Sequence, residues 1–167
     1  FNPLTEDRGM GLLQGNDGML YGTFAGGGFG SGAGVFRMNQ DGSAYSAVFI
    51  NPDWFEFDEI KILEGTDGVL YGTAWYGASF NGSVFKLNRD GSGYAELFDF
   101  PPPQNGFSPT DMIEGFDGNL YGGAVGALFR IGRDGSGYSV VHTNGPSRLL
   151  QGSNGALYCT SGTIFTV

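Results

Sequence analysis

The stretch Leu13-Gln-Gly-Asn-Asp-Gly-Met-Leu-Tyr21 decides the fold, because its pattern recurs four times along the chain. The other copies are Leu63–Tyr71, Ile113–Tyr121 and Leu150–Tyr158, and the copies begin 50, 50 and 37 residues apart. Each is followed by an aliphatic residue and phenylalanine, at Val35-Phe36, Val84-Phe85, Leu128-Phe129 and Ile164-Phe165. Self-similarity at such a spacing is the signature of a repeat architecture. The chain is therefore an array of one supersecondary unit.

Composition supports a folded, strand-rich chain. Of 167 residues, 32 are glycine, and aromatic and charged residues each make up 15%. Phenylalanine and tyrosine recur at fixed repeat positions and supply apolar surface to bury, which argues against disorder. Glycine combined with β-branched and aromatic residues is typical of short strands joined by tight turns.

The charge distribution excludes several classes of partner. The formal net charge is −9, and the eight basic residues form no cluster. A nucleic-acid partner would require a footprint of lysine and arginine, and an anionic membrane surface would require a polybasic segment. No apolar run reaches the roughly 18 to 20 residues of a spanning helix.

Aligning the copies predicts four strands per unit. In the second unit they are Glu59–Glu64, Val69–Ala74, Ser83–Asn88 and Tyr94–Phe100, here called strands A to D. The A–B and C–D connections both end in Asp-Gly, a strong hairpin signal because glycine accepts positive φ. No segment shows a sustained 3.6-residue apolar period. The sequence predicts an all-β protein.

Four antiparallel strands in units of about 40 to 50 residues predict a β-propeller with four-stranded blades. We expect one propeller segment over residues 1–167, with blades at approximately 9–49, 59–98, 110–142 and 147–167. A β-sandwich is the alternative, but it does not require nearly identical units.

The last unit is expected to be incomplete. Val167 aligns with positions inside strand C, and Phe1 aligns with the end of strand D. If the two ends together make one unit, that unit lacks the ten positions equivalent to Asn39 through Val48. The chain also has no initiator methionine and no signal peptide. These features predict a segment of a longer array, with three complete blades and one that lacks its outer strand. The unpaired strand edge could be completed by missing flanking sequence or by another copy's strand, and we expect self-association, as a closed oligomer or a fibre.

The motifs resemble those of a bacterial extracellular tandem-repeat family with the consensus G-x-DG-x-LYGT, G-T-VFKL, a DG turn and a Y-x-x-L-x-x-F strand. The matching stretches are Gly65–Thr73, Gly82–Leu87 and Tyr94–Phe98, and the resemblance covers essentially the whole chain. It implies secreted or surface-attached propeller arrays without assigned activity, and hence an extracellular or cell-surface location. The fourth unit departs from the consensus at Asn154 and Cys159.

The DG-x-LYG core is also similar to the blades of tachylectin-2-like lectins, which bind amino sugars. Gly118–Tyr121 and Arg130–Gly132 resemble repeats of streptogramin-lyase propellers. Lyases of that kind depend on a histidine, and His142 is the only one here. Because His142 stands where other units have phenylalanine, we expect it to pack.

Function is expected where the units differ. Variation lies in the B–C loops (25–32 and 75–81) and the D–A connections (50–58 and 100–110), which emerge at the same end of a four-stranded meander. Aromatic loops on a rigid scaffold are where binding tends to concentrate. Aromatic rings beside carboxylates suit sugars, which have apolar C–H faces and hydroxyl groups. The predicted ligand-binding residues are Trp54, Trp75, Tyr76, Asp58, Phe80 and Phe107. The competing interpretations are a subunit contact and plain packing.

Other chemistry fits the sequence less well. The Asp-Gly turns lack the alternating oxygen donors and distal glutamate of an EF-hand-type calcium loop, so Asp17, Asp67 and Asp117 are interpreted as turn formers. The glycine-rich 26–34 stretch lacks a phosphate-binding motif. We predict no cofactor, no metal and no catalytic residue. Paired acids among Asp53, Glu56, Asp58 and Asp111 would be needed for the alternative, a glycosidase-type or lyase enzyme. Cys159, which replaces a strand-B glycine, is interpreted as buried.

The sequence as a whole predicts a non-catalytic binding or scaffold module of a secreted or surface protein, possible partners being a glycan and further copies of the chain. The alternative function is a structural, self-assembling repeat.

Overall fold

The computed structural model describes residues 8–25, 32–51, 60–74, 82–101, 109–124, 126–143, 145–146, 148–160 and 164–166. These residues form four antiparallel sheets whose strands follow one another in chain order. The first sheet contains β1 (Arg8–Gln14), β2 (Leu20–Ala25), β3 (Ala33–Met38) and β4 (Ser46–Asn51). The second contains β5 (Lys61–Glu64), β6 (Leu70–Ala74), β7 (Ser83–Leu87) and β8 (Ala95–Asp99).

The third sheet contains β9 (Asp111–Glu114), β10 (Leu120–Ala124), β11 (Ala127–Ile131) and β12 (Ser139–His142). The fourth has three strands, β13 (Arg148–Gln151), β14 (Leu157–Thr160) and β15 (Ile164–Thr166). The all-β prediction of three complete blades and one partial blade is confirmed. In the second unit the observed strands begin or end one or two residues inside the predicted ranges. No helix long and apolar enough to cross a membrane occurs among the described residues.

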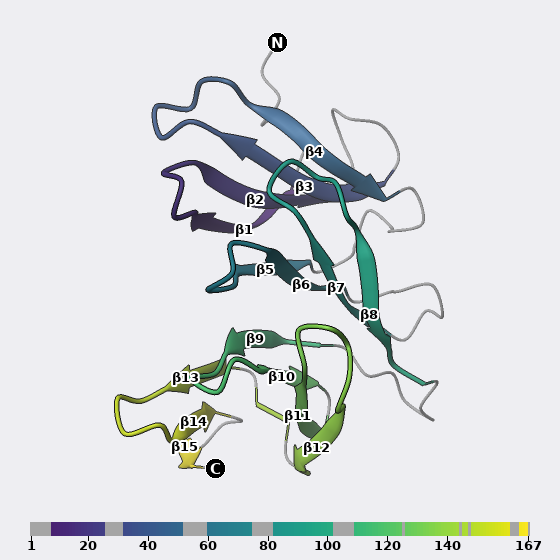
Figure 1. Ribbon diagram of the computed structural model, residues 1–167, viewed down its shortest axis with the longest axis vertical. Helices are drawn as coiled ribbons and strands as arrows, with labels where there is room; N and C mark the ends of the chain where they lie inside the picture. Colours follow the sequence, from purple (N-terminus) through teal and green to yellow (C-terminus); the bar gives the residue numbers. More distant parts are fainter. Residues whose placement is uncertain are drawn as a thin grey trace.

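The four sheets follow one another in an arc, and their first strands lie closer together than their last strands (Figure 1). Their first strands lie on the inner side, where β1 neighbours β5, β5 neighbours β9, and β9 neighbours β13. The last strands β4, β8 and β12 lie on the outer side (Figure 1). Among the described strands, none of the first sheet contacts one of the fourth. The four sheets therefore form an arc of a propeller and do not close on themselves.

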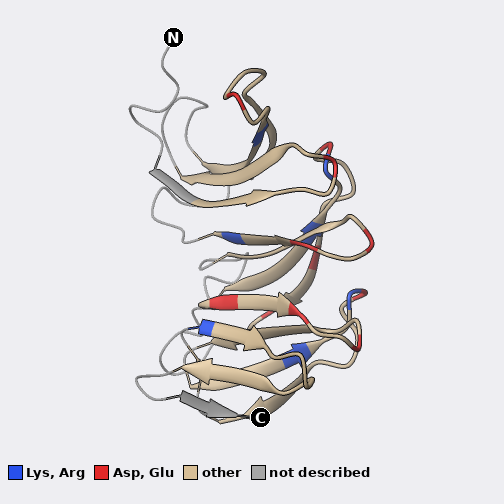
Figure 2. Cartoon of the chain, turned by 90° about the vertical axis from the view of Figure 1, so that its left-hand side faces the viewer, with Lys and Arg blue, Asp and Glu red and all other residues tan. Residues whose placement is uncertain are grey.

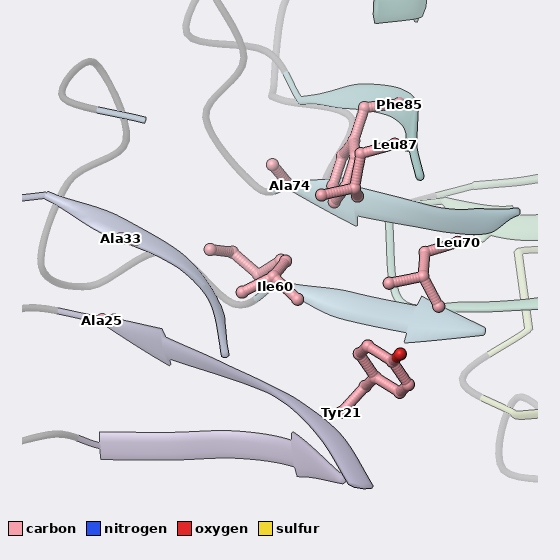
Figure 3. Packing of buried hydrophobic residues seen from close by; sticks show 9 residues of the cluster. Tyr21, Ala25, Ala33, Ile60, Leu70, Ala74, Phe85 and Leu87 are labelled. Carbon is pink, nitrogen blue, oxygen red and sulfur yellow. The ribbon is translucent and has the colours of Figure 1, made fainter. Parts of the chain in front are cut away.

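The hydrophobic core lies between neighbouring sheets. Tyr21 and Val35 of the first sheet pack with Leu70 and Phe85 of the second, and all four are at most 1% exposed. Figure 3 shows the Tyr21 ring lying toward Leu70 and Ile60 across the gap between the sheets. The same positions form the core between the second and third sheets. Each sheet thus has a forward face, toward the following sheet, and a backward face, toward the preceding one.

Hydrogen bonds in the A–B turn explain why the nine-residue motif recurs. In the first copy the Gly15 amide donates to the Met19 carbonyl, the Gly18 amide donates to the Gly15 carbonyl, and Gly18 has φ +80°. This is a three-residue hairpin loop in which the left-handed residue is glycine, as such loops require. Asp17 Oδ1 accepts the Met19 amide at 3.0 Å, and Asp17 Oδ2 accepts the Tyr21 hydroxyl at 2.7 Å. The interpretation of the motif aspartate as a turn former is confirmed.

A glycine in the middle of strand B allows close packing within each sheet. A Cβ atom on Gly22, Gly72 or Gly122 would lie 2.2–2.3 Å from the Cζ atom of the phenylalanine on the paired strand. The ring therefore occupies the space above the glycine. In the fourth sheet Cys159 stands at this position and is fully buried, as expected.

Candidate functional site

A cavity of about 300 Å³ lies along the inner strands. Four of its lining residues come from one equivalent position of the four units, two residues before the nine-residue motif begins. That position is occupied by Gly11, Lys61, Asp111 and Arg148. The last three are the first residues of β5, β9 and β13, so they follow directly on the D–A connections. The cavity is thus built at the end of the strands where the variable loops enter.

Two of the charged side chains are held by the neighbouring blade. Lys61 Nζ donates a hydrogen bond to the carbonyl oxygen of Thr110, and Asp111 Oδ2 accepts the amide of Leu149 at 2.9 Å. Both side chains are half-buried, whereas Arg148 is exposed. The cavity therefore combines two positioned groups of opposite charge with one guanidinium that faces solvent.

The rest of the lining is apolar. It consists of Leu12, Ile62, Leu63 and Met112. A few polar groups above an apolar wall are typical of small-ligand sites, where the wall supplies contact area and the polar groups fix orientation. Lys61 and Arg148 supply donors for carboxylate or hydroxyl oxygens, and Asp111 supplies an acceptor for hydroxyl or amino groups.

Two buried hydroxyl groups lie at the same end of the second sheet. Thr73 and Ser83 are fully buried, and neither Thr73 Oγ1 nor Ser83 Oγ has a hydrogen-bond partner among the described residues. The equivalent Thr23 Oγ1 donates to the carbonyl of Ile60 at 3.0 Å. Buried polar atoms are nearly always paired in folded proteins. This end of the second sheet therefore holds unused hydrogen-bonding capacity.

The opposite end of the sheets carries the hairpin turns, and charged residues mark these turns on one side of the molecule (Figure 2). Their interactions are structural. Partial burial acts to raise the pKa of Asp17, but hydrogen bonds from Tyr21 and from the Met19 amide outweigh it and lower the pKa below its ordinary value. Burial and the bond to Asp17 raise the pKa of Tyr21 to about 12. The Asp17 carboxylate therefore remains an ionised acceptor, which suits turn formation.

Glutamates at the ends of the inner strands connect the second and third sheets to the turn of the preceding sheet. Glu114 Oε2 accepts the amide of Thr66 at 2.6 Å, and Arg133 Nη1 lies 3.2 Å from Glu114 Oε1 and 3.3 Å from Asp67 Oδ2. Glu64 makes the equivalent bond to the Asn16 amide at 2.7 Å and is paired with Arg89. These junctions are repeated scaffold contacts.

The six ligand-binding residues predicted from the sequence lie outside the described residues, as do three of the four acids considered for an enzyme, Asp58 being in both sets. These are Trp54, Trp75, Tyr76, Asp58, Phe80 and Phe107, with Asp53 and Glu56. Of the four acids, Asp111 is described, and it lines the cavity. Lys61 and Arg148 were missed, although comparing the residue types at this one repeat position would have revealed them.

His142 does not pack as expected. It lies on β12 opposite Leu128 and is exposed. The equivalent Phe49 and Phe98 stack on tyrosines of the following sheet, Tyr94 and Tyr138, with ring centroids 4.5 and 3.9 Å apart. The described part of the fourth sheet has three strands and no equivalent of β8 or β12. Within the described residues, no group of three or more histidine, cysteine or acidic side chains is placed to hold a metal.

Solved structures support the fold. The chain is similar to the extracellular domain of the one-component system BT4673 from B. thetaiotaomicron (TM-score 0.69, 10% identity, 92% of this chain and 20% of that chain). It is also similar to PorZ, a surface component of the type-IX secretion system of Porphyromonas gingivalis (0.70, 13%, 96% and 26%). A third similar structure is the gluconolactonase XC5397 from Xanthomonas campestris (0.65, 16%, 93% and 54%).

The chain thus spans between a fifth and just over half of the length of these structures. At these identities the likeness shows the fold, a segment of a β-propeller, and does not transfer an activity. No model of a known family matches the sequence, and no curated protein matches it.

Proposed function

We propose that this chain is a non-catalytic binding module of a secreted or surface protein, and that it binds a carbohydrate at the loop end of the inner strands. The observation that carries this proposal is the cavity in which Lys61, Asp111 and Arg148 occupy equivalent positions of successive blades. By contrast, the motif tyrosine is kept in all four units and the strand-B glycine in three of them. Chemical diversity at a single lining position is the pattern of a surface adapted to a ligand.

The chemistry of the cavity suits a polar ligand with an apolar face. Sugar hydroxyls can accept from Lys61 and Arg148 and donate to Asp111, while the aliphatic wall contacts C–H groups. An exposed guanidinium also favours a sugar that carries a carboxylate, because such hydrogen bonds are charge-assisted. The predicted aromatic residues of the loops, such as Trp54 and Trp75, belong to connections that enter at this end and would add stacking surfaces.

The number of carboxyl groups that line the cavity supports a non-catalytic role. Glycosidases require two carboxyl groups flanking the scissile bond. Within the described lining of the cavity, Asp111 is the single carboxylate. Placement outside the cell is supported by similar structures that are extracellular or surface domains. We extend that placement to this chain as part of the proposal.

The proposal is tested by titrating the chain with neutral oligosaccharides and with their uronic-acid counterparts. The only two tryptophans are Trp54 and Trp75, so intrinsic fluorescence reports on the loops, and calorimetry gives the affinity. Arg148→Gln should weaken binding of an acidic sugar by roughly 10- to 100-fold, because a charge-assisted hydrogen bond contributes about 1.5–3 kcal/mol. Arg37→Gln removes the same charge from β3, outside the cavity lining, and should leave the affinity unchanged.

A lack of response to every neutral and acidic sugar would refute the carbohydrate ligand. Equal losses in the two arginine variants would show that the cavity is not the binding site.

A further inference from the structure

The backward face of the first sheet is uncovered. Its position on the inner strand is Leu12, which is 61% exposed, whereas the equivalent Met112 and Leu149 are 7% and 8% exposed. The difference arises because Met112 and Leu149 are covered by the forward face of the preceding sheet. Leu20 of this face is likewise only half-buried, whereas its equivalent Leu70 is fully buried. The first sheet thus presents an apolar face of the kind that packs at each internal junction.

The forward face of the fourth sheet is uncovered in the same way. Leu150 is 65% exposed, while its equivalents Leu13, Leu63 and Ile113 pack against the sheet that follows each of them. Each of these two leucines occupies a position that packs on a neighbouring sheet at the internal junctions, and none of the described residues covers it. The two faces are opposite halves of one kind of junction.

Hydrogen-bonding groups on the two faces match as well. At each internal junction, the side chain that ends the inner strand accepts a backbone amide from the preceding A–B turn. Gln151 Oε1 accepts the Phe116 amide at 2.7 Å. Glu64 and Glu114 accept the equivalent amides at the other two junctions. The equivalent groups on the uncovered faces are the exposed side chain of Gln14 and the amide of Ser153, which lies in an exposed turn. A junction between these faces would form the same bond.

The two uncovered faces carry neutral groups where the internal junctions carry charged ones. At the second and third sheets a glutamate and an arginine from the backward face meet an aspartate of the preceding turn. On the uncovered faces all three positions carry neutral amides, namely Gln14, Gln40 and Asn154. Joining these two faces therefore leaves no charge unpaired. An aspartate in place of Asn154 would have no cation opposite it, and an unpaired charge in an interface is costly.

We propose that the forward face of the fourth sheet docks on the backward face of the first sheet of a second copy of this chain. The contact is head to tail, and two such contacts related by a twofold axis complete a ring from two copies. The second copy then closes the arc of inner strands, so the cavity is enclosed only in the assembly. This inference goes beyond the proposed binding function and does not rest on it.

The experiment measures the mass of the chain in solution by light scattering and sedimentation. The chain should have twice its mass of 17.7 kDa. Leu12→Glu and Leu150→Glu should each give a monomer, because either change places a carboxylate in both junctions of the ring. Mixing the two variants should restore a dimer held by one junction, in which the intact forward face of Leu12→Glu meets the intact backward face of Leu150→Glu, while the second junction carries both carboxylates and stays open.

Phe116→Glu is the matched control. Phe116 is a 72% exposed apolar residue in an A–B turn and lies on neither face, so its replacement should leave the dimer intact. Because Leu12 and Leu150 are exposed, each variant should retain the far-ultraviolet circular dichroism of the unchanged chain.

A monomeric unchanged chain would overturn the proposal. Dissociation by Leu12→Glu but not by Leu150→Glu, or the reverse, would show a symmetric contact of one face with itself. Failure of the mixed variants to associate would likewise refute a head-to-tail contact.

Discussion

Replacing Gly72 with alanine tests whether the strand-B glycine is required by packing. Gly72 lies on β6 opposite Phe85, and a Cβ atom there would be 2.3 Å from Phe85 Cζ and 2.7 Å from the carbonyl oxygen of Lys61. Phe85 is fully buried, so its ring cannot move away without disturbing the core. Overpacking of this kind costs about 2–3 kcal/mol. For a chain of this size, that corresponds to a loss of about 4–12 °C in Tm.

The assay is thermal and urea denaturation followed by circular dichroism, with Gly11→Ala as the matched control. A Cβ on Gly11 would meet only Thr23 Oγ1, at 3.6 Å, so that substitution should be neutral or stabilise the chain by up to about 1 kcal/mol. Phe85→Leu removes the ring atom that clashes. In that background Gly72→Ala should cost about 1–2 kcal/mol less, as measured by a double-mutant cycle. Equal Tm values for the two alanine variants, or strictly additive effects in the cycle, would refute the reasoning.

Three further predictions concern the turns, the junctions and the thiol. The pKa of Asp17 is lowered in the folded chain, so its contribution to stability is present above the unfolded pKa near 4 and is lost as pH falls through the lower folded value. The pKa of Tyr21 is raised to about 12, so its contribution to stability is present below pH 10 and is lost as pH rises from 10 to 12. Urea midpoints measured across pH should therefore fall at both extremes, and a constant midpoint would contradict the titration scheme. Glu114→Ala should destabilise the chain by about 1–3 kcal/mol, because the side chain is 9% exposed and accepts a hydrogen bond from the Thr66 amide of the preceding turn. As a control, Glu96→Ala on the exposed side of β8 should change the stability by less than about 0.5 kcal/mol. Burial raises the pKa of the Cys159 thiol, so a thiol reagent should label it slowly in the native chain and rapidly in denaturant; rapid native labelling would contradict its burial.

Much of the fold was predictable because its instructions are local. The turn from Gly15 to Met19 forms from hydrogen bonds within nine residues, and its glycine and aspartate are required by backbone geometry alone. Repetition then multiplied this signal four times. His142 shows the limit of that argument, because it stands at the repeat position of Phe49 and Phe98 and yet is exposed.

The candidate site was predictable only in part. The sequence placed variation in the loops that enter at one end, and the charged cavity is built at that same end. Lys61 and Arg148 gave no signal as single residues, since isolated basic residues are common on solvated surfaces. Their importance depends on their lining one cavity from inner strands that are far apart in the sequence.

The sequence by itself determined the repeating unit, its strands and its turns, because these depend on hydrogen bonds and φ preferences among residues close together in the chain. Only the tertiary structure decided that the four sheets form an arc that does not close, that Leu12 and Leu150 remain exposed, and that one repeat position lines a cavity. The physical reason is that the packing of one sheet on the next is set by contacts between residues about 50 positions apart, such as Tyr21 with Leu70. Such contacts fix the angle between sheets, and no local pattern encodes that angle.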